Sequence, residues 1–191
     1  MPDKQAKILS ADHINDLLHF ADNTRQPVRN RVIVLLSVKA GLRAAEIAQL
    51  TWPMILNAVG EVADTIELED RIAKKRSGRR IPIHQDLKDA LRHLTRKSRA
   101  TGPIIQSQRG KAMTPLSIVV WFNRAYSALG LAGCSSHSGR RTFITKAARS
   151  VYRAGGSLRD VQILAGHRSI QTTQRYIEGD SDAQRRLVSL I

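Results

Sequence analysis

One short stretch of alternating residues interrupts a chain whose other apolar residues recur mainly at helical spacing. Residues 62–68 carry an alternating pattern in which Glu67 separates Ile66 from Leu68, and such alternation is typical of a strand with one buried face. Residues 71–75 and 80–83 flank Arg76-Ser-Gly-Arg79, a sequence that favours a hairpin turn. Pro82 would confine its strand to an edge or an end. We therefore predict a mainly α fold of the α+β class, with a small antiparallel sheet of about three strands.

Helical patterns occupy most of the chain on both sides of this sheet. Ser10 is placed to cap the first helix, and Pro27 suits the first turn of the second, which Gly41 ends. Trp52-Pro53 would end helical structure before the sheet. We expect helices beginning near Ser10 and Gln85, and over Val28–Ala40, Ala44–Leu50, Leu116–Leu129, Ser138–Ser150, Leu158–Ala165, Ile170–Tyr176 and Asp182–Leu190.

The charge balance predicts a polyanionic partner. The 191 residues include 31 Lys and Arg against 16 Asp and Glu, a formal net charge of +15. Eleven of these basic residues, against three acidic ones, lie between Asp70 and Arg99. Neutralising phosphates with such residues releases condensed counterions, so we expect the predicted sheet region to contact nucleic acid.

The composition also limits the class of protein. No apolar run reaches the roughly 18 residues of a membrane helix, and we expect no membrane partner. The single Cys134 excludes an internal disulfide framework and is expected to be a buried or half-buried filler in a cytoplasmic protein. The length suits one ordinary domain.

Two arginines, two histidines and a tyrosine carry the chemistry. Arginine forks bind phosphate oxygens, histidines exchange protons near neutral pH, and tyrosine supplies a nucleophilic oxygen. Such a set can hold a phosphodiester and attack it without a metal. The residues are Arg43, His137, Arg140, His167 and Tyr176.

The order and spacing of these residues resemble the catalytic domain of tyrosine recombinases, the phage integrase family. Ala40–Trp52 is similar to the family's first arginine box, and His137-Ser-Gly-Arg140 to its second. Leu164-Ala-Gly-His167, followed nine residues later by Tyr176, is similar to its last box. The resemblance covers residues 7–182 and implies that family's fold.

The resemblance also implies roles for individual residues. Arg43 would bind phosphate with Glu46 as its orienting partner, and Tyr176 would be the nucleophile. Lys74, eight residues before Pro82, matches the family's general acid, with the adjacent Lys75 as the alternative. The remaining basic residues of these segments are expected to contact DNA: Lys75, Arg76, Arg79, Arg80 and Arg141.

The second box departs from the family pattern in two positions. Gly139 replaces the usual leucine and Arg141 the usual histidine. Neither position carries the chemistry. A glycine is expected to weaken the packing of the first helical turn.

The implied activity is site-specific recombination of double-stranded DNA through a 3′-phosphotyrosine, with no cofactor, metal or ATP. Four protomers on two duplexes are implied, with possible accessory DNA-bending proteins. We expect one catalytic domain over residues 1–191, without an N-terminal core-binding domain. The chain is then a fragment or a short family member. Its tail, residues 183–191, either docks on a neighbouring protomer or folds back.

Three other functions remain open. A type IB topoisomerase would use the same residue types, and a non-catalytic DNA-binding regulator could retain the fold. A metal nuclease would need acidic ligands such as Asp64, Glu67, Glu69 and Asp70. The alternation of this segment instead predicts that these acids line a solvated strand face.

Overall fold

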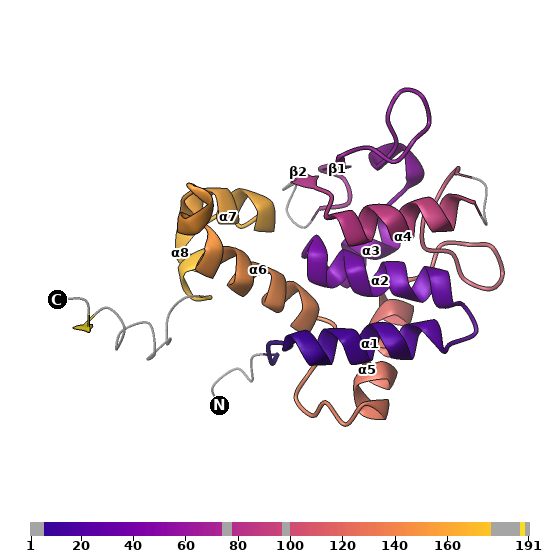
Figure 1. Ribbon diagram of the computed structural model, residues 1–191. Coiled ribbons are helices and arrows are strands. Elements are labelled where there is room, and N and C mark those ends of the chain that lie inside the picture. Colours follow the sequence, from indigo (N-terminus) through magenta and orange to yellow (C-terminus); the bar gives the residue numbers. More distant parts are fainter. Residues whose placement is uncertain (1–5, 74–77, 97–99, 177–187, 190–191) are drawn as a thin grey trace. The chain divides into compact units, whose positions relative to one another are not determined.

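The computed structural model describes residues 6–73, 78–96, 100–176 and 188–189. The chain divides into two compact units, Met1–Phe143 and Ile144–Ile191 (Figure 1). The elements are mainly helices with one small antiparallel sheet, as predicted. Within the described residues, no helix combines the length and the apolar character that a membrane span requires.

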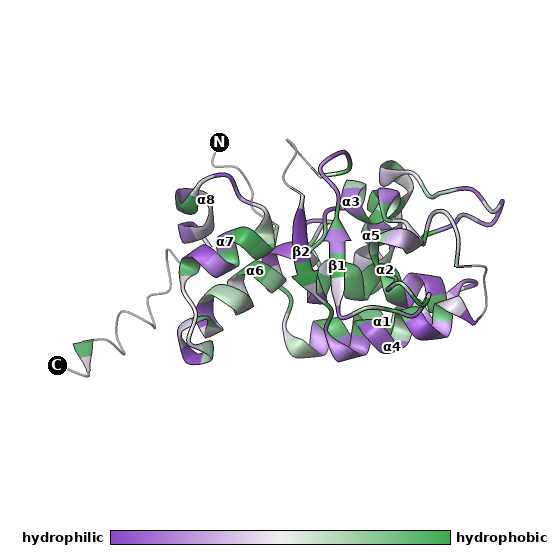
Figure 2. Ribbon diagram, turned by 90° about the horizontal axis from the view of Figure 1, so that it is seen from above, coloured by the Kyte–Doolittle hydropathy of each residue, from purple (hydrophilic) through white to green (hydrophobic). Residues whose placement is uncertain are grey.

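Helix α2 (Pro27–Lys39) lies at the centre of the first unit. Its residues Val32–Leu36 are completely buried. Helix α1 (Ala11–Asp22) and helix α4 (Gln85–Thr95) both pack against it. Figure 2 shows α2 as largely hydrophobic, whereas α4 also carries hydrophilic stretches. The buried helix therefore forms the core on which the surrounding helices place their apolar sides.

Local signals set the helix ends as predicted. Ser10 caps α1 by accepting a hydrogen bond from the backbone N–H of His13 at 3.1 Å, and Pro27 occupies the first turn of α2. Helix α3 (Ala44–Gln49) follows, and a short 3₁₀ helix then spans Trp52–Met54. The expectation that Trp52-Pro53 ends helical structure was therefore wrong by one turn.

Helix α5 (Pro115–Ala128) packs against α3 and α1. Its Phe122 and Tyr126 are buried and stacked, with ring centroids 5.8 Å apart. The Tyr126 hydroxyl has no hydrogen-bond partner among the described residues, and burial raises the pKa of this phenol. Tyr126 is thus a core residue.

The sheet has two strands in the described part of the chain, not about three. Strand β1 (Thr65–Leu68) pairs antiparallel with β2 (Arg79–Pro82), Thr65 lying opposite Pro82 and Leu68 opposite Arg79. Residues 71–73, expected in a strand, form a turn. The backbone N–H groups of Ile72 and Ala73 both donate to the carbonyl of Glu69, which curls the chain out of an extended conformation.

The remaining helices bear out the predicted bounds closely. Helix α6 (Ser138–Ser150) contains the boundary between the two units, and helix α7 (Leu158–Ala165) packs against α8 (Ile170–Gln174) in the second. Helix α8 ends two residues earlier than predicted. The helix expected over Asp182–Leu190 lies outside the described residues except for Val188 and Ser189.

Candidate active site

Arg43 lies immediately before α3, where the chain turns from extended to helical backbone. Its backbone N–H donates to Glu46 Oε2 at 2.9 Å, and its Nη1 donates to Glu46 Oε1 at 2.8 Å. The side chain of Arg43 is 22% exposed, and that of Glu46 is 1% exposed. The predicted Arg43–Glu46 pair therefore exists, and it holds one side of a partly exposed guanidinium group.

Arg79 joins the same carboxylate from strand β2. Its Nη1 and Nη2 donate to Oε1 and Oε2 of Glu46 at 3.1 and 3.2 Å, and its side chain is 3% exposed. Burial by itself would raise the pKa of Glu46, but the hydrogen bonds and charges of Arg79 and Arg43 hold that pKa below its ordinary value. Arg79 was expected on the DNA-contacting surface; the structure places it in the interior instead.

Arg140 is brought to the loop that contains Arg43. Arg140 is 4% exposed, and its Nη1 donates to the carbonyl oxygen of Gly41 at 2.6 Å. Gly41 precedes Arg43 by two residues. The guanidinium group of Arg140 is therefore bound to the loop that carries Arg43, although the two segments are almost a hundred residues apart in sequence.

Gly139 allows the start of α6 to lie close to α2. A Cβ atom at this position would lie 2.2 Å from Ser37 Oγ and 3.1 Å from Val38 Cγ1. The expectation that Gly139 weakens packing was wrong, because its missing side chain is what lets the two helices approach.

His137 and Arg141 flank Arg140 in the sequence but differ from it in exposure. His137 is exposed in the turn before α6, and its backbone N–H donates to Ser135 Oγ at 3.3 Å. Arg141 is partly buried and donates from Nη1 to the carbonyl of Ala6 at 3.0 Å. Part of the Arg141 fork is thus bound to the protein itself.

In the second unit, His167 and Tyr176 lie against each other. Their rings are stacked with centroids 5.5 Å apart and an interplanar angle of 23°. Tyr176 is half-buried, unlike the core residue Tyr126, while Tyr152 is 69% exposed. Tyr176 therefore retains a partly accessible ring beside an imidazole.

The backbone and one hydroxyl hold His167. Gly166 ends α7 in the left-handed conformation with φ 62°, and the N–H of His167 donates to the carbonyl of Gln162 at 3.0 Å. The Nδ1 atom of His167 lies 3.0 Å from Oγ1 of the buried Thr173. If this hydroxyl donates to Nδ1, the proton of the neutral ring sits on Nε2, which is then a donor.

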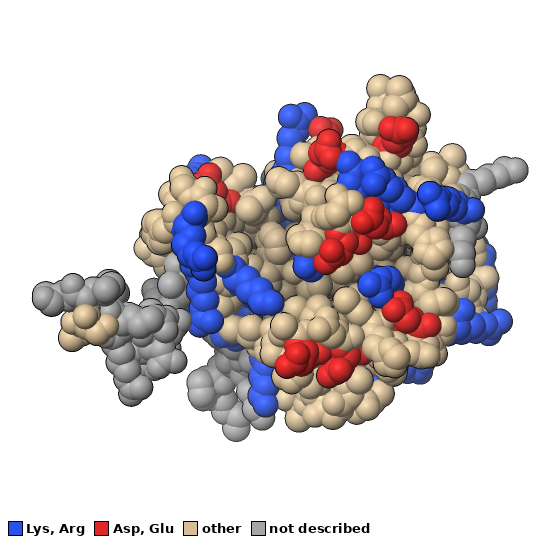
Figure 3. Space-filling model, viewed as in Figure 1, with Lys and Arg blue, Asp and Glu red and all other residues tan. Residues whose placement is uncertain are grey.

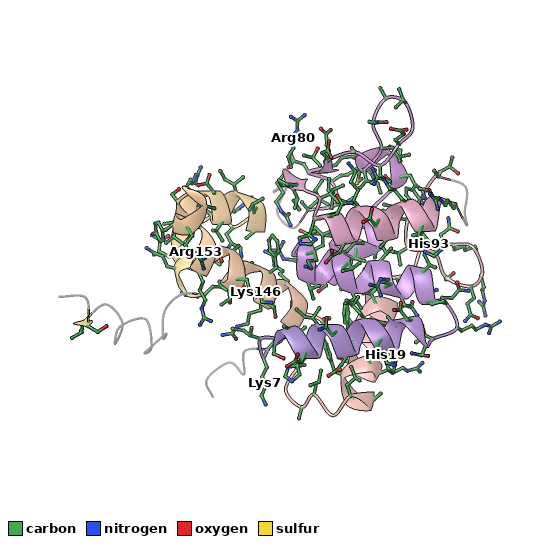
Figure 4. All side chains as sticks on the ribbon, viewed as in Figure 1. Lys7, His19, Arg80, His93, Lys146 and Arg153 are labelled. Carbon is green, nitrogen blue, oxygen red and sulfur yellow. The ribbon has the colours of Figure 1, made fainter. Side chains whose placement is uncertain are left out.

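The structure describes only some of the basic residues that were expected to contact DNA. Lys74, Lys75 and Arg76 lie outside the described residues. Arg80 projects away from the sheet (Figure 4) and pairs with Glu67 at 2.9 Å. On the face drawn in Figure 3, acidic side chains lie among the Lys and Arg side chains. Several basic residues on the first unit are thus partly neutralised by neighbouring acids.

The acidic residues that a metal nuclease would need have other partners. All four are exposed, as predicted, and each is bound within the protein: Asp64 to Lys88, Glu67 to Arg80, Glu69 to Arg71 and Asp70 to the backbone N–H of Gly78. Among the described residues, no group of three His, Cys, Asp or Glu side chains could hold a metal ion. The cysteine Cys134 is half-buried, as expected.

The sequence patterns assigned Arg79 to the DNA-contacting surface and not to Glu46, and they did not single out Thr173. Arg79 and the buried Ile81 are two residues apart on β2 and therefore share a face, so strand periodicity could have placed Arg79 on the inward side. Thr173 offers no comparable signal, because its contact with His167 depends on how α8 folds back after the turn.

Comparison with known proteins identifies a family. The model of the phage integrase family matches residues 7–182. The tyrosine recombinase XerC of Rickettsia prowazekii is 28% identical over 177 residues, which are 90% of this chain and 53% of that protein. XerC of Xylella fastidiosa is 27% identical over 180 residues, which are 93% of this chain and 58% of that protein. The chain thus spans about half the length of the curated relatives it matches.

Solved structures share the fold at low identity. The XerA recombinase superposes with a TM-score of 0.74 at 22% identity, covering 99% of this chain and 67% of that one. The XerH recombinase, in a post-cleavage complex with a palindromic difH substrate, superposes with a TM-score of 0.75 at 20% identity. This match covers 99% of this chain and 54% of that one.

Proposed function

This chain belongs to the phage integrase family, and we propose from that premise that it cuts and rejoins double-stranded DNA at specific sites. The observation that carries the proposal is the hydrogen bond from Arg140 to the carbonyl of Gly41, which brings two arginines to one loop. Paired arginine forks suit the non-bridging oxygens of a phosphodiester. Tyr176 beside His167 supplies a nucleophile with an imidazole neighbour.

In the first step, the Tyr176 oxygen attacks the phosphorus and forms a 3′-phosphotyrosine bond as the bond to the 5′ oxygen breaks. His137 accepts the phenolic proton, and Lys74 protonates the departing 5′ oxygen. Arg43, Arg140 and His167 stabilise the charge that develops on the non-bridging oxygens. The charges and bonds of this step balance without a metal or ATP.

In the second step, the 5′ hydroxyl of another strand attacks the phosphotyrosine and releases the phenol. The covalent bond conserves the energy of the broken phosphodiester, so rejoining requires no other energy source. We propose that residues 1–191 form one catalytic domain.

Binding to DNA is proposed for the basic residues that remain candidates for the surface. These are Lys75, Arg76, Arg80 and Arg141. The proposal includes a homo-oligomer on two DNA sites, with residues 183–191 docking on a neighbour. The XerH structure bound to its difH substrate supports the DNA partner by analogy of fold.

A covalent trap tests the proposal directly. The protein is incubated with a pool of duplexes that carry randomised half-sites and a nick beside the central cleavage region. Loss of the short fragment at the nick prevents rejoining, so a phosphotyrosine complex accumulates and its DNA can be sequenced. We expect a denaturation-resistant complex whose peptide map places the DNA on Tyr176.

Two variants and one added reagent give this experiment its controls. Tyr176→Phe should abolish the complex, while Tyr152→Phe, at an exposed tyrosine, should retain it. The reaction should persist in EDTA. Absence of a trapped complex would favour a non-catalytic regulator, and relaxation of supercoiled plasmids without sequence preference would favour a topoisomerase.

A further inference from the structure

The Glu46 carboxylate is shared between two arginines in an unequal way. Oε1 accepts from Nη1 of Arg43 and Nη1 of Arg79, while Oε2 accepts from the backbone N–H of Arg43 and Nη2 of Arg79. Arg79 therefore holds both oxygens with its fork, whereas the guanidinium group of Arg43 holds one oxygen through one nitrogen.

This sharing leaves part of the Arg43 fork uncommitted. Within the described residues, neither Nε nor Nη2 of Arg43 donates a hydrogen bond, and the side chain is 22% exposed. Glu46 and Arg79 are both sealed from solvent, with side chains 1% and 3% exposed. The exposed arginine is thus the one with donors to spare.

We propose that Arg79 is a positioning residue, which occupies Glu46 so that Arg43 keeps two donors available for a phosphate. The proposal rests on the function proposed above. A fork that pairs with a carboxylate through both nitrogens has few donors left for a phosphodiester. By holding the carboxylate with its own fork, Arg79 prevents that geometry at Arg43.

The charges explain why removing Arg79 would redirect Arg43 rather than only loosen the structure. A buried carboxylate that loses one partner has a strong drive toward the nearest remaining cation. For Glu46 that cation is Arg43, three residues away and already bound through Nη1. Rotation of the Arg43 fork onto both oxygens would restore two strong hydrogen bonds and withdraw Nε or Nη2 from the phosphate.

The Arg79→Met variant tests this positioning role. The assay is single-turnover cleavage of a duplex with the sequence that the covalent trap recovers. Per molecule of folded protein, we expect the cleavage rate constant to fall about 100-fold. Affinity for the duplex should fall no more than about threefold, because binding is spread over many basic residues. The surface variant Arg31→Met, which breaks an exposed pair with Asp22, should cleave at the wild-type rate.

A second variant separates positioning from a general loss of stability. In Arg79→Met/Glu46→Gln, the neutral amide no longer attracts Arg43, so the rate constant should recover about tenfold from that of Arg79→Met. Loss of folded protein would lower the amplitude of the cleavage phase, whereas misplacement of Arg43 lowers its rate constant. Thermal unfolding of each variant fixes the temperature at which all are compared.

The Arg79→Lys variant keeps the charge but cannot fork across two oxygens, and it should fold and cleave at an intermediate rate. A wild-type rate constant in Arg79→Lys and Arg79→Met would overturn the positioning role while leaving the proposed recombinase intact. Failure of both variants to fold would also overturn it, because the pair would then serve stability. No covalent complex with the wild-type protein would instead refute the proposed function itself.

Discussion

Arg140 donates from Nη1 to the carbonyl oxygen of Gly41 at 2.6 Å, in the buried interior of the first unit. The bond joins helix α6 to the loop that carries Arg43, and Gly139 lets that helix approach α2. The contact satisfies a buried carbonyl, and in the proposed function the same guanidinium group also binds the phosphate.

Replacing Arg140 should therefore impair both stability and cleavage. Arg140→Ala leaves the Gly41 carbonyl without this donor, which should cost about 1–3 kcal/mol in the free energy of unfolding. Cleavage by folded protein should fall about 100-fold or more, with a much smaller loss of DNA affinity. Urea unfolding, a DNA-binding titration and single-turnover cleavage measure the three effects. Equal losses of binding and cleavage would argue against a role in the transition state.

The approach of α6 to α2 predicts a specific steric conflict. In Gly139→Ala the new methyl group would meet Ser37 Oγ at 2.2 Å, so we expect a loss of about 1–2 kcal/mol despite the better helix propensity of alanine.

Ser37 supplies the matched test of that conflict. Its hydroxyl is buried without a hydrogen-bond partner among the described residues, so Ser37→Ala alone should be neutral or slightly stabilising. Ser37→Ala in the Gly139→Ala background should recover part of the lost stability in urea unfolding. If the effects of the two substitutions on the free energy of unfolding simply add, the two residues do not collide.

The contact between His167 and Thr173 predicts an effect on catalysis from a shape-conserving change. Thr173→Val removes the hydroxyl 3.0 Å from His167 Nδ1 but keeps the volume of a fully buried side chain. We expect covalent complex formation to slow about tenfold because the imidazole loses its fixed orientation. Thr173→Ser retains a hydroxyl and should react faster than the valine variant, and identical rates for all three proteins would refute the role.

The buried carboxylate of Glu46 predicts a pH dependence of stability. Its pKa is lower in the folded protein than its ordinary value of 4.5. The stabilisation from its pairing is therefore present above about pH 4.5 and is lost as the pH falls through the folded-state pKa. Glu46→Gln should unfold about 3–5 kcal/mol more easily at pH 7, and its stability should decline less steeply below pH 4.5 than that of the wild type.

Glu67→Gln is the control for this measurement. Its carboxylate pairs with Arg80 on the surface, with side chains 60% and 78% exposed. We expect a change of no more than about 0.5 kcal/mol at pH 7 and an acid-unfolding curve close to that of the wild type. Matching curves for Glu46→Gln and the wild type would remove Glu46 as a source of the acid sensitivity.

Much of the helical architecture could be predicted from the sequence, because the residues that start and end each helix lie within one or two turns of its ends. Ser138–Ser150 and Leu158–Ala165 were predicted with the bounds that the structure has, because caps, apolar spacing and glycine stops act locally. The strand count was wrong where Ile72 and Ala73 turn back on the Glu69 carbonyl, since consecutive buried residues fit a turn as readily as a short strand.

The sequence by itself determined the family, the small sheet among helices and which residue types carry the chemistry, because motif order and spacing are properties of the chain alone. Only the tertiary structure decided that Arg79 faces inward to Glu46, that Arg140 binds the Gly41 carbonyl and that Gly139 is needed for close packing. Each of these depends on a partner more than thirty residues away in sequence, and hydrophobic periodicity specifies which face is buried without specifying what it meets.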